Sequence, residues 1–386
     1  MNILVIGNGF DIAHGLPTGY KDFLLFVSIL QHLASDTAFT PLCEKEEKML
    51  TFLMTLKEQS ANREELAAAV WNELAELIDN NVWVSYFQEI SIKERWVDFE
   101  KEISKVIQAL DSARKYVEEK VRHGEKSACI EAWQHNVLRP ILGFDTDDYR
   151  NISFEPRAFT YRKGQLLKDL NRLTRCLEIY LSEYINNLPV TYLLPDIQGL
   201  NIDKVLSFNY TDTFGRVYNA DGQKKIDYDF IHGKASSESN WQACNLVIGI
   251  DEYLQGQDKD LDNEYIEFKK FYQRIFKGTG NAYTRWLITS NSYVIDVFQK
   301  NRTKVHPQVK VYFYGHSLDV TDKDILRQLL TSEWVTTTIF YHSKESLGDQ
   351  IANLVKVIGE EELIQRTGGP ERRIIFKEIT TTSPAT

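Results

Sequence analysis

The stretch that decides the expected fold is MNILVIGNGFDIAHGLPTGYKDFL, residues 1–24. The run from Ile3 to Ile6 is apolar without alternation, which is typical of a parallel strand buried on both faces. Gly7 and Gly9 follow at once, and glycine allows positive φ angles and close approach of the main chain. The apolar residues after Gly9 predict the start of a helix. A strand, a glycine turn and a helix start can receive a phosphate on backbone N–H groups, and they can equally be a plain connection.

The composition predicts a globular protein of two or three domains. The chain has 386 residues, of which 43% are hydrophobic, 26% charged and 12% aromatic, and its formal charge is −10. This acidic balance argues against a general affinity for nucleic acid or anionic membranes. The chain begins without a basic leader region, and no window approaches the roughly 18 apolar residues of a membrane span. We therefore expect a cytoplasmic protein with no membrane partner.

The cysteines do not form a metal-binding or disulfide pattern. Cys43, Cys129, Cys176 and Cys244 lie far apart and never occur as CxxC. Such thiols are typical of a reduced, cytosolic protein. We expect no metal cofactor.

Two kinds of pattern divide the chain. From about Glu44 to Asn187 the apolar residues recur every three or four positions, as in helices, apart from an expected loop at 139–159. From about Ile202 onward, short apolar runs end in Gly, Asn, His or Ser, as in the strands of an open α/β sheet. The expected strands lie within 202–214, 225–233, 245–251, 310–326, 335–343 and 372–379, and one helix is expected over 348–365.

These patterns predict an α/β, Rossmann-like fold with a mainly parallel sheet and a large helical insertion. Residues 1–35 and 200–345 are expected to form a discontinuous core, with 40–195 as a helical insertion or cap. Residues 346–386 are expected to add a C-terminal helix, a strand and a polar tail.

Four polar stretches should meet at one edge of this sheet, because ligands of open α/β sheets lie at the carboxyl ends of the strands. They are Gly7-Asn8-Gly9-Phe10-Asp11 with Pro17 beyond it, Asn209-Tyr210-Thr211-Asp212, His232-Gly233 and Gly315-His316-Ser317. Each has a plain structural interpretation as well. Asn209 and Asp212 suit an Asx turn or a helix cap, and a lone histidine before glycine is more often a core residue.

The order of these stretches resembles that of the sirtuin-like nicotinamide-dinucleotide fold. The chain is more similar still to the AbiH family, bacterial abortive-infection proteins linked to phage resistance. The stretches that carry this resemblance are IGNGFDIAHGLPTGYKDFL, LSFNYTDTF, IHG and YGHSLDVTDKDIL, with WVDFEKEI in the helical region. The resemblance runs from Met1 to about Ser343.

The resemblance implies an anti-phage protein that binds NAD or a related nucleotide, with a phage-derived trigger or protein partner and a capacity to form homo-oligomers. It does not extend to protein deacylation, because sirtuin deacylases carry a four-cysteine zinc module that these cysteines cannot supply. The implied catalytic residues are Asn209 and His232. The implied nucleotide-binding residues are Gly7, Asn8, Gly9, Phe10, Asp11, Pro17, Tyr210, Asp212, Gly315, His316 and Ser317.

The reaction that suits these residues is hydrolysis of the nicotinamide–ribose bond, which passes through an oxocarbenium-like sugar. Asn209 can position the water, and His232 can bond ribose hydroxyls or act as a general base near neutral pH. Asp11 can add negative charge or bind ribose. The alternative is a non-catalytic module that senses a nucleotide or phage component and signals to a partner. A nuclease is less favoured, because no PD-(D/E)xK-like cluster is evident.

Overall fold

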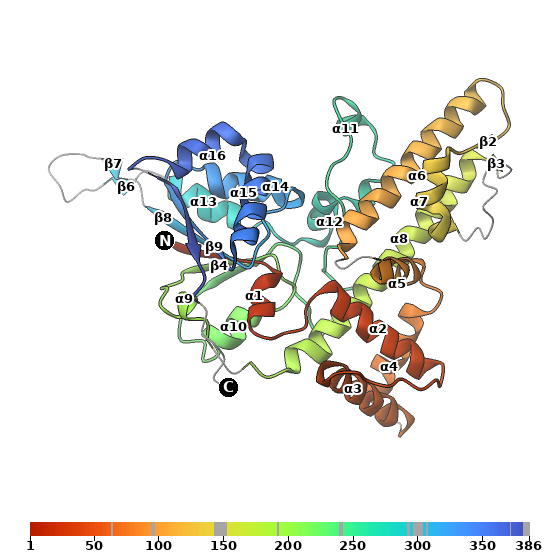
Figure 1. Ribbon diagram of the computed structural model, residues 1–386, viewed down its shortest axis with the longest axis horizontal. Coiled ribbons are helices and arrows are strands. Elements are labelled where there is room, and N and C mark those ends of the chain that lie inside the picture. Colours follow the sequence, from red (N-terminus) through yellow and green to blue (C-terminus); the bar gives the residue numbers. More distant parts are fainter. Residues whose placement is uncertain are drawn as a thin grey trace. The chain divides into compact units, whose positions relative to one another are not determined.

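The computed structural model describes residues 1–62, 65–93, 97–142, 153–190, 193–238, 242–291, 294–295, 304–305, 308–370 and 372–380 (Figure 1). The chain divides into two compact units. The first, the sheet unit, comprises Met1–Thr18, Ile185–Lys234 and Lys277–Thr386. The second, the helical unit, comprises Gly19–Tyr184 and Ala235–Phe276.

The sheet unit is built on one six-stranded parallel sheet of order β10-β9-β8-β1-β4-β5. Counted along the chain, these strands have the doubly wound order 3-2-1-4-5-6 of Rossmann folds. In the central strand, Val5 lies opposite Leu206 on one side and Phe313 on the other. The predicted Rossmann-like α/β fold is therefore confirmed. The strands are β1 (Asn2–Ile6), β4 (Lys204–Ser207), β5 (Asp227–Phe230), β8 (Val309–Tyr314), β9 (Val335–Tyr341) and β10 (Ile374–Glu378).

Helices cover both faces of this sheet, which explains why β1 is apolar at every inner position. Ile3 and Val5 belong to one hydrophobic core, whereas Leu4 and Ile6 belong to another. The first core is completed by apolar residues of α13 (Tyr283–Asn291), α14 (Lys323–Thr331), α15 (Lys344–Ile358) and α16 (Glu360–Thr367). The second is completed by α1 (Asn8–Ala13), α9 (Pro195–Gln198) and α10 (Thr213–Tyr218).

Several short elements complete the sheet unit. They are η3 (Ile185–Asn187), η5 (Val320–Asp322) and the two-stranded pair of β6 (Val294–Ile295) and β7 (Lys304–Val305).

The helical unit packs around stacked aromatic rings. The ring of Phe99 lies 4.1 Å from that of Tyr20 and 3.9 Å from that of Phe87, both nearly parallel. None of the helices that the structure describes is both long and apolar enough to span a bilayer. The long helices are α2 (Tyr20–Ala34), α3 (Glu44–Ala61), α4 (Glu65–Ile78), α5 (Val82–Lys93), α6 (Phe99–Arg122), α7 (Ala132–Leu142) and α8 (Pro156–Ile179). The shorter elements are β2 (Ala128–Cys129), β3 (Ser153–Phe154), η2 (Tyr180–Tyr184), α11 (Asp258–Leu261), η4 (Ile266–Phe268) and α12 (Lys270–Lys277).

The boundaries of the two units differ from the expected ones. Helix α2 groups with the helical unit, because its apolar face packs on other rings there: Phe26 lies 4.8 Å from Tyr180, and Phe23 lies 6.2 Å from Phe99. Residues 235–276 also group with the helical unit, whereas α15, α16 and β10 group with the sheet unit.

Three expected elements take another form. The run 245–251 contributes only an isolated bridge between Ile250 and Lys269, not a strand. The helix expected over 348–365 is divided at Gly359, which has φ 89° and separates α15 from α16. The loop expected at 139–159 is shorter, since α7 continues to Leu142 and α8 begins at Pro156. Residues 143–152 between them, and the end of the polar tail from 381, lie outside the described residues.

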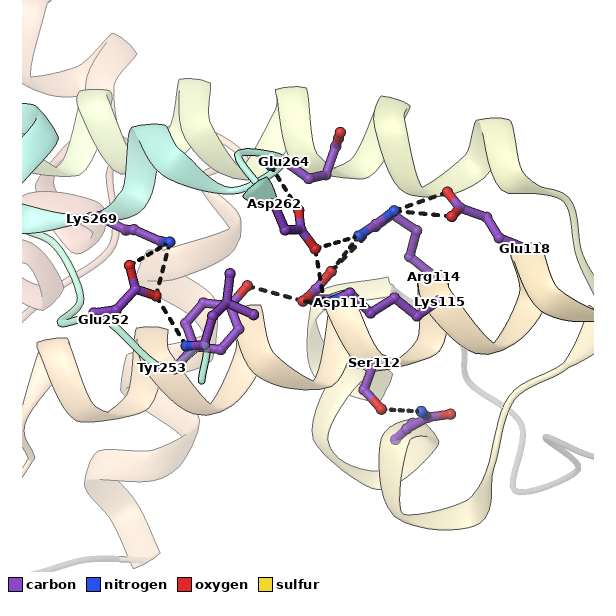
Figure 2. Close-up of polar contacts among 12 residues, drawn as sticks. Asp111, Ser112, Arg114, Lys115, Glu118, Glu252, Tyr253, Asp262, Glu264 and Lys269 are labelled. Atoms are coloured by element: carbon purple, nitrogen blue, oxygen red, sulfur yellow. Dashed lines mark hydrogen bonds and ion pairs between the residues drawn. The ribbon is translucent and has the colours of Figure 1, made fainter. Parts of the chain in front are cut away.

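An ionic cluster ties the segment 250–276 to helix α6 (Figure 2). Asp111 is 3% exposed and accepts hydrogen bonds from Arg114 at 2.7 Å and from the Tyr253 hydroxyl at 3.2 Å. Lys115 bridges Asp111 at 3.0 Å and Asp262 at 2.9 Å. These charged groups thus meet around the buried carboxylate of Asp111, which explains why this late segment belongs with the helices.

We expect Asp111→Ala to release the segment 250–276 from α6. Removing the Asp111 carboxylate takes away the acceptor that Arg114 and the Tyr253 hydroxyl share, and such a loss costs roughly 1–3 kcal/mol. Amide hydrogen exchange of the segment should therefore rise at least tenfold. Glu89→Ala is the control, because Glu89 pairs with Lys93 on an exposed helix face and such a pair contributes little. Equal exchange in the two variants would contradict this interpretation of the cluster.

Candidate functional site

The candidate site lies at the carboxyl edge of the parallel sheet. The strands β1, β4, β5 and β8 are neighbours in one sheet, so the residues that follow them share that edge. The strand order reverses between β1 and β8, which is the place where open α/β sheets bind ligands. The predicted residues after these four strands all lie on this edge. Asn8 and Ser317 are exposed there, whereas Asp11, Asn209, His232 and His316 are buried.

The glycine turns after β1 and β8 pack main chain against main chain. The Gly7 N–H donates to the Tyr314 carbonyl at 3.2 Å, and the Gly9 N–H donates to the Gly315 carbonyl at 2.8 Å. A Cβ on Gly9 would lie 2.8 Å from the Gly315 Cα, and a Cβ on Gly315 would lie 2.1 Å from the Phe10 nitrogen. The glycines therefore permit a close approach of two turns. The amides of Gly7 and Gly9 donate to protein carbonyls, as does that of Phe10, which bonds the Gly7 carbonyl at 2.8 Å.

A buried carboxylate, Asp11, lies beside the turn after β4. Its Oδ2 accepts a hydrogen bond from the Thr211 hydroxyl at 2.5 Å, and the Thr213 hydroxyl donates to Thr211 at 3.2 Å. Burial raises the pKa of Asp11 to about 6, and the hydroxyls, the Asn209 amide and the charge of Arg216 oppose that rise only in part. Asp11 is thus a carboxylate that titrates near neutral pH.

Two polar atoms of this group have no partner among the described residues. They are Oδ1 of Asp11 and Nδ2 of Asn209, on side chains that are 1% and 4% exposed. The Asn209 amide is near enough to lower the pKa of Asp11, yet the pair does not meet hydrogen-bond geometry. The Asn209 backbone is fixed by Ser207, whose hydroxyl accepts from its N–H at 3.1 Å. A buried acceptor and a buried donor thus lie close together on this edge, each without a hydrogen bond that meets the geometric criteria among the described residues.

A second polar group joins the ends of β5 and β8. Nε2 of His232 lies 3.3 Å from Oδ1 of Asp322, and Nε2 of His316 lies 3.7 Å from Oδ2 of the same carboxylate. The Phe208 ring contacts both imidazoles, with centroids 5.6 Å from His232 and 4.3 Å from His316. The structure thus brings together two predicted residues from distant parts of the sequence through an acid that was not predicted.

The other predicted residues have more local roles. Asp212 caps α10 by accepting from the Gly215 N–H at 3.2 Å, and it pairs with Lys234 at 2.7 Å. The Asn8 side chain accepts from the Thr18 hydroxyl at 2.6 Å, next to the half-buried Pro17. The Tyr210 ring lies 6.3 Å from that of His232. The Ser317 carbonyl accepts from Asn353 at 3.0 Å.

Sequence reasoning missed Asp322, and it placed Thr211 in a stretch at the site edge without giving it a role. Asp322 lies within the quoted stretch GHSLDVTDKDIL, where it resembles one of several acids at a helix start. Thr211 lies between Tyr210 and Asp212, both of which were singled out. The feature of the sequence that could have identified Thr211 is its place in the turn after β4.

The cysteines and acids provide no metal site in the part of the chain that the structure describes. No group of three or more His, Cys, Asp or Glu residues is arranged there to hold an ion. Burial raises the pKa of the Cys176 thiol to about 12, so this cysteine stays protonated and unreactive.

We expect Gly315→Ala to disrupt the sheet unit. Gly315 has φ 66°, and an added Cβ would overlap the Phe10 nitrogen, so the two turns would have to separate. The variant should be insoluble or melt at a much lower temperature. Gly348→Ala is the matched control, since Gly348 lies exposed in α15 with nothing near its Cβ position. It should gain about 0.5–1 kcal/mol of stability. Similar melting temperatures would contradict the packing role of Gly315.

We expect Asp11 to make stability fall as pH rises. Because its pKa is raised from 3.8 to about 6 in the folded state, its stabilising contribution is complete below pH 3.8 and is lost as pH rises through about 6. The unfolding free energy of the wild type minus that of Asp11→Asn should drop by about 3 kcal/mol between pH 4 and 7.5. Asp36→Asn is the control, because Lys57 lowers the pKa of the exposed Asp36 and the trend reverses. A difference for Asp11→Asn that does not change with pH would contradict the assignment.

The sequence of the chain was compared with known protein families, curated proteins and solved structures. The family described as bacteriophage abortive infection AbiH matches residues 3–342, a range that contains all the candidate site residues. No curated protein and no solved structure matches the chain. The match spans most of the chain, from the first strand to just past β9. The chain therefore belongs to the AbiH family of bacteriophage abortive-infection proteins.

Proposed function

We propose that this chain is an abortive-infection effector that binds NAD or a related nucleotide at the carboxyl edge of its sheet and hydrolyses the nicotinamide–ribose bond. Its family membership gives it an anti-phage role. The nucleotide, the hydrolysis and activation by a phage-derived trigger are the proposal. A supporting feature is the Rossmann strand order, whose switch point lies between β1 and β8.

The observation that carries the proposal is the buried pair of Asp11 Oδ1 and Asn209 Nδ2, which have no partner among the described residues. A ribose hydroxyl is both donor and acceptor, so one hydroxyl could donate to the carboxylate and accept from the amide. A purely structural site would be expected to satisfy such atoms, because an unpartnered buried polar group costs roughly 1–3 kcal/mol. The pair therefore favours a sugar ligand over a role in packing alone.

The same residues suit the chemistry of glycosidic cleavage. The ribose carbon becomes positively charged in the transition state, and a nearby carboxylate such as Asp11 stabilises that charge. The leaving nicotinamide is cationic before cleavage and departs neutral, so no strong acid is required. His232, paired with Asp322, is suited to accept the proton of the attacking water.

A second candidate function is a nucleotide sensor without turnover. It is favoured by the amides of Gly7, Gly9 and Phe10, which already donate to protein carbonyls. A pyrophosphate would then bind through fewer backbone amides than in a typical glycine turn. Such a protein would bind nucleotide and signal to a partner.

The test is release of free nicotinamide from NAD by purified protein, with and without lysate of infected cells. Asn209→Ala and His232→Ala should each lower the rate by about a hundredfold or more, because each removes a preorganised group from the transition state. Their melting temperatures should stay within a few degrees of the wild type. Asn62→Ala and His342→Ala are matched controls at exposed positions and should keep full activity.

Three other outcomes would change the conclusion. NAD binding without nicotinamide release under either condition would support the sensor. Neither binding nor release would contradict both candidates. An active but heat-labile His232→Ala protein would show that His232 is a core residue, since its loss would leave Asp322 with one partner fewer at a cost of roughly 1–3 kcal/mol.

A further inference from the structure

We infer that Asp322 is a positioning residue that sets the tautomer of His232 and lies beside the Nε2 atom of His316, whose tautomer the turn after β8 sets. Its carboxylate lies between the two imidazoles, with one oxygen toward each Nε2 atom. All three residues are at most 8% exposed. The catalytic consequence rests on the proposed function, whereas the tautomer assignment can be tested without it.

The first argument is that the Asp322 carboxylate does not cap its helix, although Asp322 stands at the capping position. Asp322 is the N-cap residue of α14, a position where an aspartate usually accepts a backbone N–H of the first turn. Asp98, Asp212 and Asp319 do this at their own helices. Asp322 makes no capping hydrogen bond and directs its oxygens to the histidines instead. The carboxylate is therefore available to contact the two imidazoles.

The second argument is that the turn after β8 fixes His316. The Leu318 N–H donates to Nδ1 of His316 at 2.9 Å. In neutral His316 the hydrogen therefore lies on Nε2, the nitrogen nearest Asp322. Leu318 has φ 58°, a left-handed conformation that is unfavourable for leucine, and its side chain is completely buried. Strain of this kind persists where the surroundings enforce it and is common at functional sites.

The third argument is that one aromatic ring holds both imidazoles in place. The Phe208 ring meets His316 at 74° and His232 at 69°, so each contact is edge to face. Phe208 directly precedes Asn209, the proposed water-positioning residue. Movement of either histidine would therefore disturb the turn after β4.

These contacts define a proton path for the proposed hydrolysis. With its hydrogen held on Nε2 by Asp322, neutral His232 has its lone pair on Nδ1, which can take a proton from water. The water oxygen then bonds to the ribose C1′ atom, and the electron pair of the C1′–N bond leaves with nicotinamide. The products are nicotinamide, the nucleotide with a free ribose hydroxyl, and an imidazolium on His232 that Asp322 stabilises. His316 shares the carboxylate and keeps it fixed between β5 and β8.

The first test reads the tautomers directly and needs no substrate. Imidazole nitrogen NMR of ¹⁵N-histidine protein, assigned with His232→Gln and His316→Gln, should show both neutral rings mainly as Nε2–H in the wild type. In Asp322→Asn, which keeps the size of the side chain, His232 should shift toward the Nδ1–H form. Asp319→Asn is the matched control, since Asp319 caps η5 and asparagine caps equally well. If Asp322→Asn folds poorly, Asp322→Ala replaces it.

The second test reads the consequence for turnover. Asp322→Asn should lower kcat at least a hundredfold with KM changed less than about threefold, because removing the orienting acid of a histidine base acts on the transition state. Asp319→Asn should match the wild type. An unchanged His232 tautomer in Asp322→Asn would overturn the inference whatever the kinetics. A changed tautomer in a protein that releases no nicotinamide would leave the inference standing and reject the proposed hydrolysis.

Discussion

The sheet unit depends on the contact between two glycine turns, after β1 and after β8. Gly9 and Gly315 approach so closely that neither tolerates a Cβ, and the Gly9 N–H bonds the Gly315 carbonyl. This contact fixes the ends of the two strands between which the chain reverses its direction of winding. The turns that carry Asp11 and His316 start from it. Their side chains can therefore be held within a few tenths of an ångström, as preorganised sites require.

The same contact changes how the closely spaced glycines after β1 should be interpreted. A strand followed by closely spaced glycines usually indicates a phosphate cradle, because the amides at a helix start face outward. Here those amides are used to join one turn to another. The polar groups that remain available belong to side chains, notably Asn209 and Asp11. Recognition of a ligand by this edge would thus depend more on its sugar than on its phosphates.

The sequence predicted the fold best where a single physical rule, such as burial on both faces of a strand, determined the pattern of residues. The apolar run Ile3–Ile6 identified a central strand because both faces of the sheet are covered. The change of pattern near Ile202 identified the return to the sheet. The run 245–251 was misleading, since its apolar side chains are buried although its backbone forms a single bridge, at Ile250, and no strand. Periodicity detects burial, and burial alone does not determine whether a backbone pairs.

For the site, the sequence identified the turns but not the partners within them. His232 and His316 were both singled out, yet nothing in one sequence indicates that residues 84 positions apart share one acid. Asp322 was missed because Asp at a helix start is normally explained by capping. Only the structure shows that this cap is absent. Asp212 illustrates the converse, since it lies in a conspicuous motif and caps a helix.

The register of β1 has a consequence for how the protein is made. Residues 3–6 pair with 204–207 on one side, and residues 2–6 pair with 310–314 on the other, so β1 is completed by strands that lie far later in the sequence. During translation its apolar residues emerge some two hundred residues before their first partner and about three hundred before their second. Closing such long loops is slow, and an unpaired apolar strand is prone to aggregate meanwhile. The sheet, and with it any activity at its edge, is therefore completed only after β8, β9 and β10 have been synthesised.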